Sequence, residues 1–516
     1  MRKTTLALTI GAFLAAAATP AAQAADLWDI YQLAVKNDPT FQQAQANYDA
    51  ASEDGTIARG GYLPNITLNA HRYRNENSGV QIGVDNAGNI GPQNFTSTVY
   101  ETQYQLQLTQ PIFDWAAWHN IEVANAQMAQ ADAQFTAAQE DLIQRTSTAY
   151  FNVLNARDTL RADRATVDAN AKQLEQAREK YQVGMSAITD VENAQAAYDQ
   201  SVATLISAQQ QVITNEEQLR AIIGQPVGQL MEPSVDMPLR TPNPNTPQQW
   251  VDQALKQNPN ILAAQANADV ANATIGVKRA GEMPTLNVVA QHNKTDDTGN
   301  NIFDLSHIKG NFVELELSWP LFSGFSTYAS VSQAQSQYQA ALANVNLVSR
   351  QTEQQARTAY LGVLTGISQV TSLRQSVKSN QTSMDATQTG MEVGTRTIVD
   401  VLTARQNLLT AETSFSNARY TYLESLLTLK QSAGILAEDD MKQINSLLQV
   451  PSAPADMSVP ASSVDMGAPG AGTVEAPSAA TAPSTAAPAA GTATAPAAAT
   501  GTPPASGTPP KRKHRG

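Results

Sequence analysis

Four short regions of the chain alternate between apolar and polar residues. In residues 66–70, 100–112, 286–290 and 313–321 the apolar side chains stand two positions apart for most of their length. A period of two is typical of a β-strand that has one apolar face and one polar face. We therefore predict two strands in the first half of the chain and two in the second.

These strands have the length and pattern of membrane strands. A run of about ten residues with one apolar face fits a transmembrane β-barrel, in which apolar side chains face lipid and polar side chains face the lumen. Tyr100, Tyr104 and Trp319 suit an aromatic girdle at the membrane interface. A soluble sheet that packs its apolar face on a core is the alternative. Residues 75–94 and 293–301 are rich in Gly and Asn, and we predict loops there.

Long helices follow the second strand of each half. Proline is absent from 112 to 225 and from 321 to 450, although the chain has 26 prolines. Because proline costs about 3 kcal/mol inside a helix, this absence favours unbroken helices. Residues 115–182 would form a rod on the order of 100 Å long at 1.5 Å per residue. Shorter helical patterns near 40–60 and 260–280 are predicted to stack beside the long rods.

Each long helix ends in a sequence that occurs twice, at 183–195 and at 393–405, about 210 residues apart. Each copy lies between two helical patterns, which predicts the tip of a helical hairpin. Gly184 and Gly394 can adopt the left-handed conformation that commonly ends a helix. In the first copy, Thr189 and Glu192 have the spacing of a capping box for the next helix.

The ends of the chain differ in composition from its middle. Residues 1–24 have the basic start, apolar stretch and small-residue end of a secretory signal peptide. We divide the rest into a first repeat (25–224), a link (225–247), a second repeat (248–450) and an Ala/Pro/Thr-rich tail (451–516) that we expect to be disordered. The formal net charge of −13 becomes about −15 without the two basic residues of the leader, which argues against a nucleic-acid partner.

Four membrane strands cannot close a barrel, because the smallest barrels have eight. Open strand edges would leave unpaired backbone groups in hydrocarbon, at several kcal/mol per group. Several chains must therefore share one barrel, with their rods continuing it as a cylinder. The predicted fold is mainly α, with a transmembrane β-barrel portion, long helical hairpins and a mixed α/β region between them. Such an assembly is a conduit.

The chain resembles the TolC family of outer-membrane efflux ducts over roughly residues 26–450. The resemblance rests on Thr-Ala-Tyr-Phe-Asn-Val-Leu-Asn-Ala at 148–156, Ala-Ile-Thr-Asp-Val at 187–191 and Val-Gly-Thr-Arg-Thr-Ile-Val-Asp-Val-Leu at 393–402. It implies a homotrimer in outer-membrane lipid, with a 12-stranded barrel and a periplasmic helical tunnel. It further implies export of drugs, toxic compounds or proteins, together with a periplasmic adaptor and an inner-membrane transporter of the RND, ABC or MFS type.

The resemblance also implies a gate at the hairpin tips. In the family a tip aspartate pairs with an arginine and a tyrosine on the facing hairpin, and two further aspartates ring the constriction. Asp190, preceded by Thr189, and Arg396 occupy the pairing positions, and Asp400 matches the first ring aspartate. A simpler interpretation of Asp190 and Asp400 is a first-turn acid that favours the helix dipole.

Two positions depart from the family pattern. Met391 replaces the tyrosine and Thr403 replaces the second ring acid, which puts the strength of the latch in doubt. The segments where family adaptors dock match the tip residues Val183, Gly184, Met185, Val393, Gly394 and Thr395. Helix capping by the two glycines is the simpler interpretation of these segments. We also hypothesise that Glu101, Glu314 and Glu316 face the lumen and make the channel cation-preferring.

Two other classes of function are weaker. Scattered histidines without ligand spacing, and no nucleophile or phosphate-binding motif, argue against an enzyme, a metal site or a cofactor. The chain has no cysteine for disulfide or thiol chemistry. A soluble periplasmic coiled-coil scaffold would explain the rods and the signal but not the alternating strands.

Overall fold

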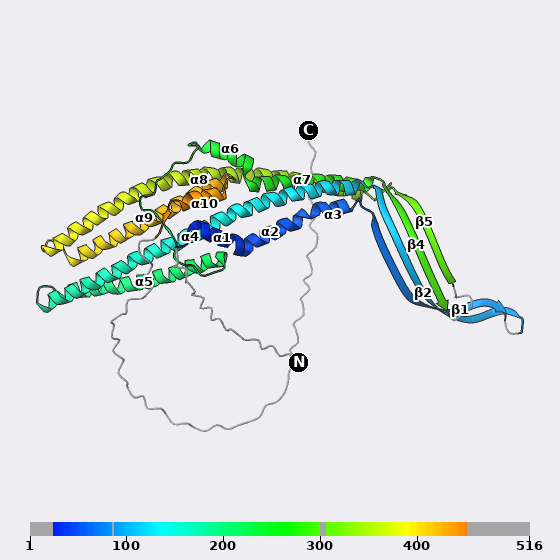
Figure 1. The fold of residues 1–516 in the computed structure, drawn as a ribbon, viewed down its shortest axis with the longest axis horizontal. Coiled ribbons are helices and arrows are strands. Elements are labelled where there is room, and N and C mark those ends of the chain that lie inside the picture. Colours follow the sequence, from blue (N-terminus) through cyan, green and yellow to red (C-terminus); the bar gives the residue numbers. More distant parts are fainter. Residues whose placement is uncertain (1–23, 85–86, 300–305, 451–516) are drawn as a thin grey trace, which may run out of the picture. The chain divides into compact units, whose positions relative to one another are not determined.

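The computed structural model describes residues 24–84, 87–299 and 306–450 (Figure 1). The expected signal peptide, apart from Ala24, and the expected C-terminal tail lie outside the described residues. The described part repeats one order of elements twice, with short helices, a strand pair and a long helical hairpin in each half. This repetition agrees with the repeated sequence at the two tips.

The four predicted strands form one antiparallel sheet. β1 (Asn65–Val84) and β2 (Ile90–Phe113) come from the first half, and β4 (Thr285–Gly299) and β5 (Ser306–Ser318) from the second. They lie in the order β1-β2-β4-β5, so the strands of the two halves meet between β2 and β4 (Figure 1).

The predicted loops were wrong for most of their length. β1 continues to Val84 and β2 begins at Ile90, so the strands occupy nearly all of 75–94. In the second half, β4 continues to Gly299 across the region predicted as a loop. Glycine and asparagine have low strand propensity, but cross-strand pairing overrides so weak a preference. The ladder from Asn75↔Val99 to Val84↔Ile90 is the pairing that overrides it here.

The long helices were predicted correctly. α4 (Trp115–Gln182) has 68 residues and α8 (Ser326–Glu392) has 67. Asp114 caps α4 by accepting hydrogen bonds from the backbone N–H groups of Ala116 and Ala117, at 2.8 and 3.1 Å. α5 (Ile188–Ile223) and α9 (Ile398–Ser432) return beside α4 and α8, which completes two hairpins (Figure 1).

Short helices extend the two-helix arrangement toward the sheet. In the first half, α2 (Pro39–Ser52) and α3 (Asp54–Gly60) pack on α4. In the second half, α7 (Pro259–Arg279) packs on both α4 and α8, and the short 3-10 helix η1 (Ala280–Glu282) leads from it to β4. The predicted stacking of short helices beside the long rods is confirmed.

The main core lies where the link crosses the hairpins. It includes the motif at 148–156, whose Tyr150 and Phe151 are fully buried. The Tyr150 hydroxyl donates to the Met231 carbonyl of the link at 2.7 Å. Three helices, α1 (Leu27–Asn37), α6 (Pro247–Gln257) and α10 (Glu438–Asn445), contribute side chains to this core. The two-residue strands β3 (Glu232–Pro233) and β6 (Leu448–Gln449) pair with each other beside it.

Candidate functional site at the hairpin tips and the sheet

The two hairpin tips have the same backbone geometry. Gly184 and Gly394 have φ values of 74° and 80°, in the left-handed region that was predicted for them. After each glycine the chain folds back on its own helix. Met185 N–H donates to the Lys180 carbonyl at 2.8 Å, and 210 positions later Thr395 N–H donates to Gly390 at 2.8 Å.

The helices that leave the tips are capped differently from the prediction. α5 begins at Ile188 after Ala187, which makes no side-chain cap, so Thr189 lies inside the helix and no box with Glu192 forms. The capping box occurs at the other tip, where Thr397 Oγ1 accepts from Asp400 N–H at 3.2 Å and Thr397 N–H donates to the Asp400 carboxylate at 2.9 Å. The Thr-x-x-Asp spacing at 397–400 could have identified it in the sequence.

The structure places the expected gate residues on the two tips. Asp190 accepts a hydrogen bond from Ser186 Oγ at 2.7 Å, and among the described residues no ion pair joins it to Arg396. The Thr397 hydrogen bonds, together with the nearby Arg396 guanidinium, hold the pKa of Asp400 below its usual range. Asp400 is therefore a carboxylate at neutral pH.

A polar contact joins the two hairpins close to their tips. Gln173 of α4 is buried, and its Nε2 lies 3.7 Å from the sulfur of Met391 on α8. Below it, Ile398 of α9 packs against the cluster of Leu174, Ala177 and Ala194. Sequence reasoning missed Gln173 and Ser186, because a polar residue inside a long helix gives no local signal of its partner.

The outer surface of the tips is apolar and exposed. Val183 is 69% exposed, Met185 78% and Val393 70%. Thr395 Oγ1 donates to the Gly390 carbonyl at 3.0 Å, which fixes this turn. Large apolar side chains exposed on rigid turns are available for contact with another protein.

The sheet register puts the three expected lumen acids on one face. Glu101 lies on the same face of β2 as Gln103, Gln105 and Gln107. It pairs with Tyr73 of β1, whose hydroxyl donates a hydrogen bond to the Glu101 carboxylate. Following the register from β2 through β4 to β5 brings Glu314 and Glu316 to this same face. The opposite face carries Ile66, Leu68, Leu106, Leu108, Val313, Leu315 and Leu317, whose side chains are mostly exposed in one chain.

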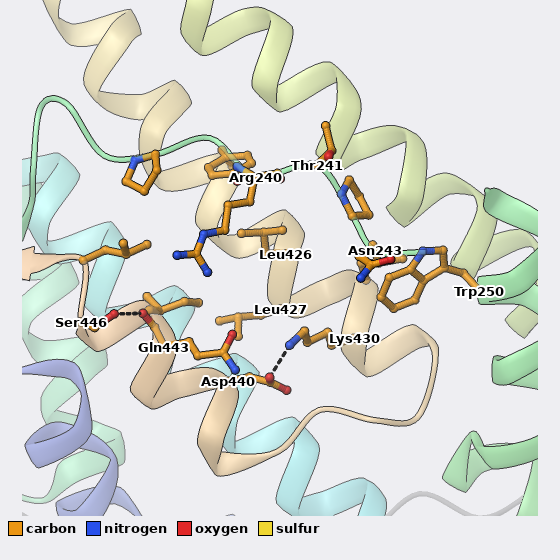
Figure 2. A pocket seen from close by; sticks show the side chains of 16 residues that line it. Arg240, Thr241, Asn243, Trp250, Leu426, Leu427, Lys430, Asp440, Gln443 and Ser446 are labelled. Carbon is orange, nitrogen blue, oxygen red and sulfur yellow. Dashed lines mark hydrogen bonds and ion pairs between the residues drawn. The ribbon is translucent and has the colours of Figure 1, made fainter. Parts of the chain in front are cut away.

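A pocket of 260 Å³ lies between the link, α9 and α10 (Figure 2). The Tyr422 hydroxyl clamps the link by donating to the Arg240 carbonyl at 3.0 Å and accepting from the Arg240 N–H at 2.7 Å. At the rim, Lys430 of α9 forms an ion pair with Asp440 of α10. We interpret this pocket as part of the packing that holds the link on the hairpins.

Within residues 24–84, 87–299 and 306–450, no helix combines the length and apolarity needed to cross a membrane. In the same ranges, no three His, Asp or Glu side chains lie close enough together to hold a metal ion.

The fold class of this chain is an antiparallel sheet with one exposed apolar face, joined to two long helical hairpins with exposed tips. The model of the family described as outer membrane efflux protein matches residues 30–225 and 250–435. The outer membrane protein TolC of Escherichia coli K12 is 34% identical over 439 residues, which cover 83% of this chain and 86% of that protein.

Other relatives and solved structures agree with this match. The alkaline protease secretion protein AprF of Pseudomonas aeruginosa is 27% identical, covering 81% of this chain and 86% of AprF. The fold matches the Campylobacter jejuni CmeC outer membrane channel with a TM-score of 0.65 at 19% identity, covering 82% of this chain and 89% of CmeC. The Vibrio cholerae protein VceC matches with a TM-score of 0.64 at 18% identity, covering 79% and 96%.

The chain belongs to the outer membrane efflux protein family. It is therefore an outer-membrane protein of an efflux family. A soluble periplasmic scaffold is not supported by this membership. The expected fold class is confirmed in its mainly helical content, its four strands per chain and its likeness to the solved outer-membrane channels.

Proposed function

We propose that three copies of this chain close one 12-stranded barrel in the outer membrane, and that their hairpins continue it as a periplasmic tunnel. Among the described residues, β1 and β5 each pair on one side only. Both edges therefore need a partner strand in hydrocarbon, where an unpaired backbone group costs several kcal/mol. Four strands per chain give twelve in three copies, and the family supports this number.

The exposure of the sheet is the observation that carries the proposal. Leu68, Leu315 and Leu317 are 66–68% exposed, although each lies within a hydrogen-bonded strand of the sheet. A soluble sheet would cover such a face with a core, whereas a barrel wall presents it to lipid. No described helix covers this face, since the extensive contacts of these strands are with one another.

The transported material passes through the barrel lumen, and no chemical conversion is proposed. By analogy with the relatives, the substrates are small toxic molecules in efflux and proteins in type I secretion. The exposed tip residues, above all Val183, Met185 and Val393, would dock a periplasmic adaptor that links the tunnel to an inner-membrane transporter. This docking can be tested by substituting Met185→Cys and measuring its cross-linking to a purified adaptor.

The tips would also form the gate. Asp190 and Arg396 would pair between chains or hairpins in the closed assembly, in place of the Ser186 contact, while Asp400 would line the constriction. An exposed pair contributes about 0–1 kcal/mol, which suits a contact that must be released. Met391 retains a contact across the hairpins through Gln173, and this contact would substitute in part for the family tyrosine.

The conductance of purified assemblies in planar bilayers tests both proposals. Wild type should give uniform small channels, and Asp190→Ala combined with Arg396→Ser should raise the basal conductance. Asp199→Ala, which removes an exposed carboxylate bonded to Gln195 on the same helix, is the matched control and should leave it unchanged. Equal conductance in all three would reject the latch, and no channels in wild type would reject the pore.

A further inference from the structure

The two faces of the sheet carry opposite charges. The four strands contain four Lys or Arg residues, and the register places all of them on the apolar face: Arg72, Arg74, Lys294 and Lys309. Four of the six acids lie on the polar face: Glu101, Asp297, Glu314 and Glu316. Charges sorted in this way indicate that the two faces contact different surroundings.

The Lys and Arg side chains lie at the helix-distal end of the apolar part of this face. One row across the sheet reads Ala70, Tyr104, Lys294 and Lys309, and the next reads Arg72, Thr102, Asp296 and His307. Closer to the helices, the rows on this face include Ile66 and Leu68 of β1 with Leu108 and Leu106 of β2. The basic rows are thus the first charged rows beyond the hydrocarbon-compatible surface.

The positive charge in these two rows is incompletely neutralised within the chain. Lys294 lies directly opposite Lys309, and like charges in this position are destabilising. Asp296 is the single acid in the two rows, and it pairs with Lys294 at 2.5 Å and lies 3.7 Å from His307. Among the described residues, no hydrogen bond or ion pair reaches the exposed Lys309 or Arg72 side chains.

We infer that Arg72, Lys294 and Lys309 bind phosphate groups of lipid headgroups in the outer leaflet, with Tyr104 at the boundary of the hydrocarbon. The inference rests on the proposed barrel, which turns this face toward lipid and its helix-distal end toward the exterior. Tyr104 lies 5.9 Å from the Lys294 ammonium, so the ring and the cation lie together at the interface. Anionic headgroups supply the counter-charge that the chain lacks here.

Native mass spectrometry of the full-length assembly can test this. The assembly is extracted from lipid discs of phosphatidylcholine with a minor fraction of phosphatidic acid, and the retained phosphatidic acid is counted. Each Lys or Arg near the surface is worth about a five-fold preference, so Arg72→Gln with Lys309→Gln should reduce retention about 25-fold. Arg72→Lys with Lys309→Arg keeps both charges and should retain the lipid.

The matched control removes two exposed arginines from the helices, Arg220→Gln and Arg357→Gln, and should retain the lipid as wild type does. Equal retention by wild type and the double glutamine variant would overturn the inference, and so would an equal loss in the helical control. Displacement of the lipid by millimolar inorganic phosphate would show a phosphate site that does not require a membrane, which also contradicts it. Channel conductance in the same lipids separates the two proposals, because an active channel with no lipid preference rejects this one alone.

Discussion

The pH dependence of stability should be governed in part by one buried carboxyl, Glu140. Its side chain lies on α4 and is 5% exposed. Burial raises the pKa of Glu140 to about 7 from 4.5, although a hydrogen bond from the Leu436 backbone opposes the rise. Because the folded pKa exceeds the unfolded one, the protonated carboxyl contributes fully below pH 4.5, and its contribution is lost as the pH rises to 7.

The size of the effect follows from this rise. At about 1.4 kcal/mol for each pH unit, a rise from 4.5 to about 7 makes the free energy of unfolding about 3 kcal/mol lower per chain above pH 7 than below pH 4.5. Glu140→Gln retains an acceptor for Leu436 without a charge that burial penalises. The variant should therefore be more stable than wild type at pH 8 and similar to it at pH 4.5.

Thermal unfolding of the detergent-purified protein, followed by circular dichroism between pH 4.5 and 8, measures this difference. Glu175→Gln, an exposed glutamate on the same helix, is the matched control and should melt like wild type at each pH. A Glu140→Gln variant that loses stability with rising pH as steeply as wild type would refute the role of this carboxyl. A Glu140→Gln variant that melts at a lower temperature than wild type at pH 8 would show that the wild-type carboxylate is ionised and stabilised by bonds to its neighbours.

Three further predictions follow from local geometry. Gly434→Ala should destabilise the chain by about 2–5 kcal/mol in thermal unfolding, because the φ of Gly434 is 70° and the new Cβ would lie 2.5 Å from Asn258 Cα. The control Gly228→Ala, which has open space around the new Cβ, should have little effect. Equal melting temperatures of the two variants would contradict this packing. Thr397→Ala should lower the free energy of unfolding by about 1 kcal/mol, because the capping box of α9 is lost, and the start of α9 should fray. Fraying would appear as faster hydrogen exchange of residues 395–401, and unchanged exchange would reject the role of the cap. Reversal potentials under a salt gradient should show that the wild-type channel prefers cations. This preference should weaken in Glu314→Gln combined with Glu316→Gln, but not in Glu76→Gln on the opposite face. Anion preference in wild type would reject the lumen assignment.

The long helices and the strand faces could be predicted from the sequence because their signals are local. The absence of proline from 112 to 225 predicts α4 closely, and the alternation in 100–112 predicts which face of β2 is apolar. The extent of β1 could not be predicted. Residues 75–84 are strand because β2 pairs with them over their full length, and a sequence of Gly and Asn gives no indication of that partner.

The tips were predictable in their turns but not in their contacts. Gly184 and Gly394 have a conformation that their residue type favours, so the sequence indicates it directly. The capping box predicted at Thr189 was wrong because α5 begins at Ile188, two residues earlier than a cap at Thr189 requires. Helix boundaries depend on small differences in backbone bonding. The Asp190–Arg396 pair stays a prediction, since in a single chain Asp190 bonds to Ser186.

Cross-linking of the strand edges tests the shared barrel most directly. The chain has no cysteine, so Ile66→Cys on β1 can be combined in turn with Val313→Cys, Leu315→Cys or Leu317→Cys on β5 without background. Within one chain these edges are three strand spacings apart, about 14 Å, which no disulfide can span. We predict that at least one pair gives a covalent three-chain species under non-reducing conditions. Monomers alone from all three pairs, in protein that remains folded in the outer membrane, would contradict a barrel shared between chains.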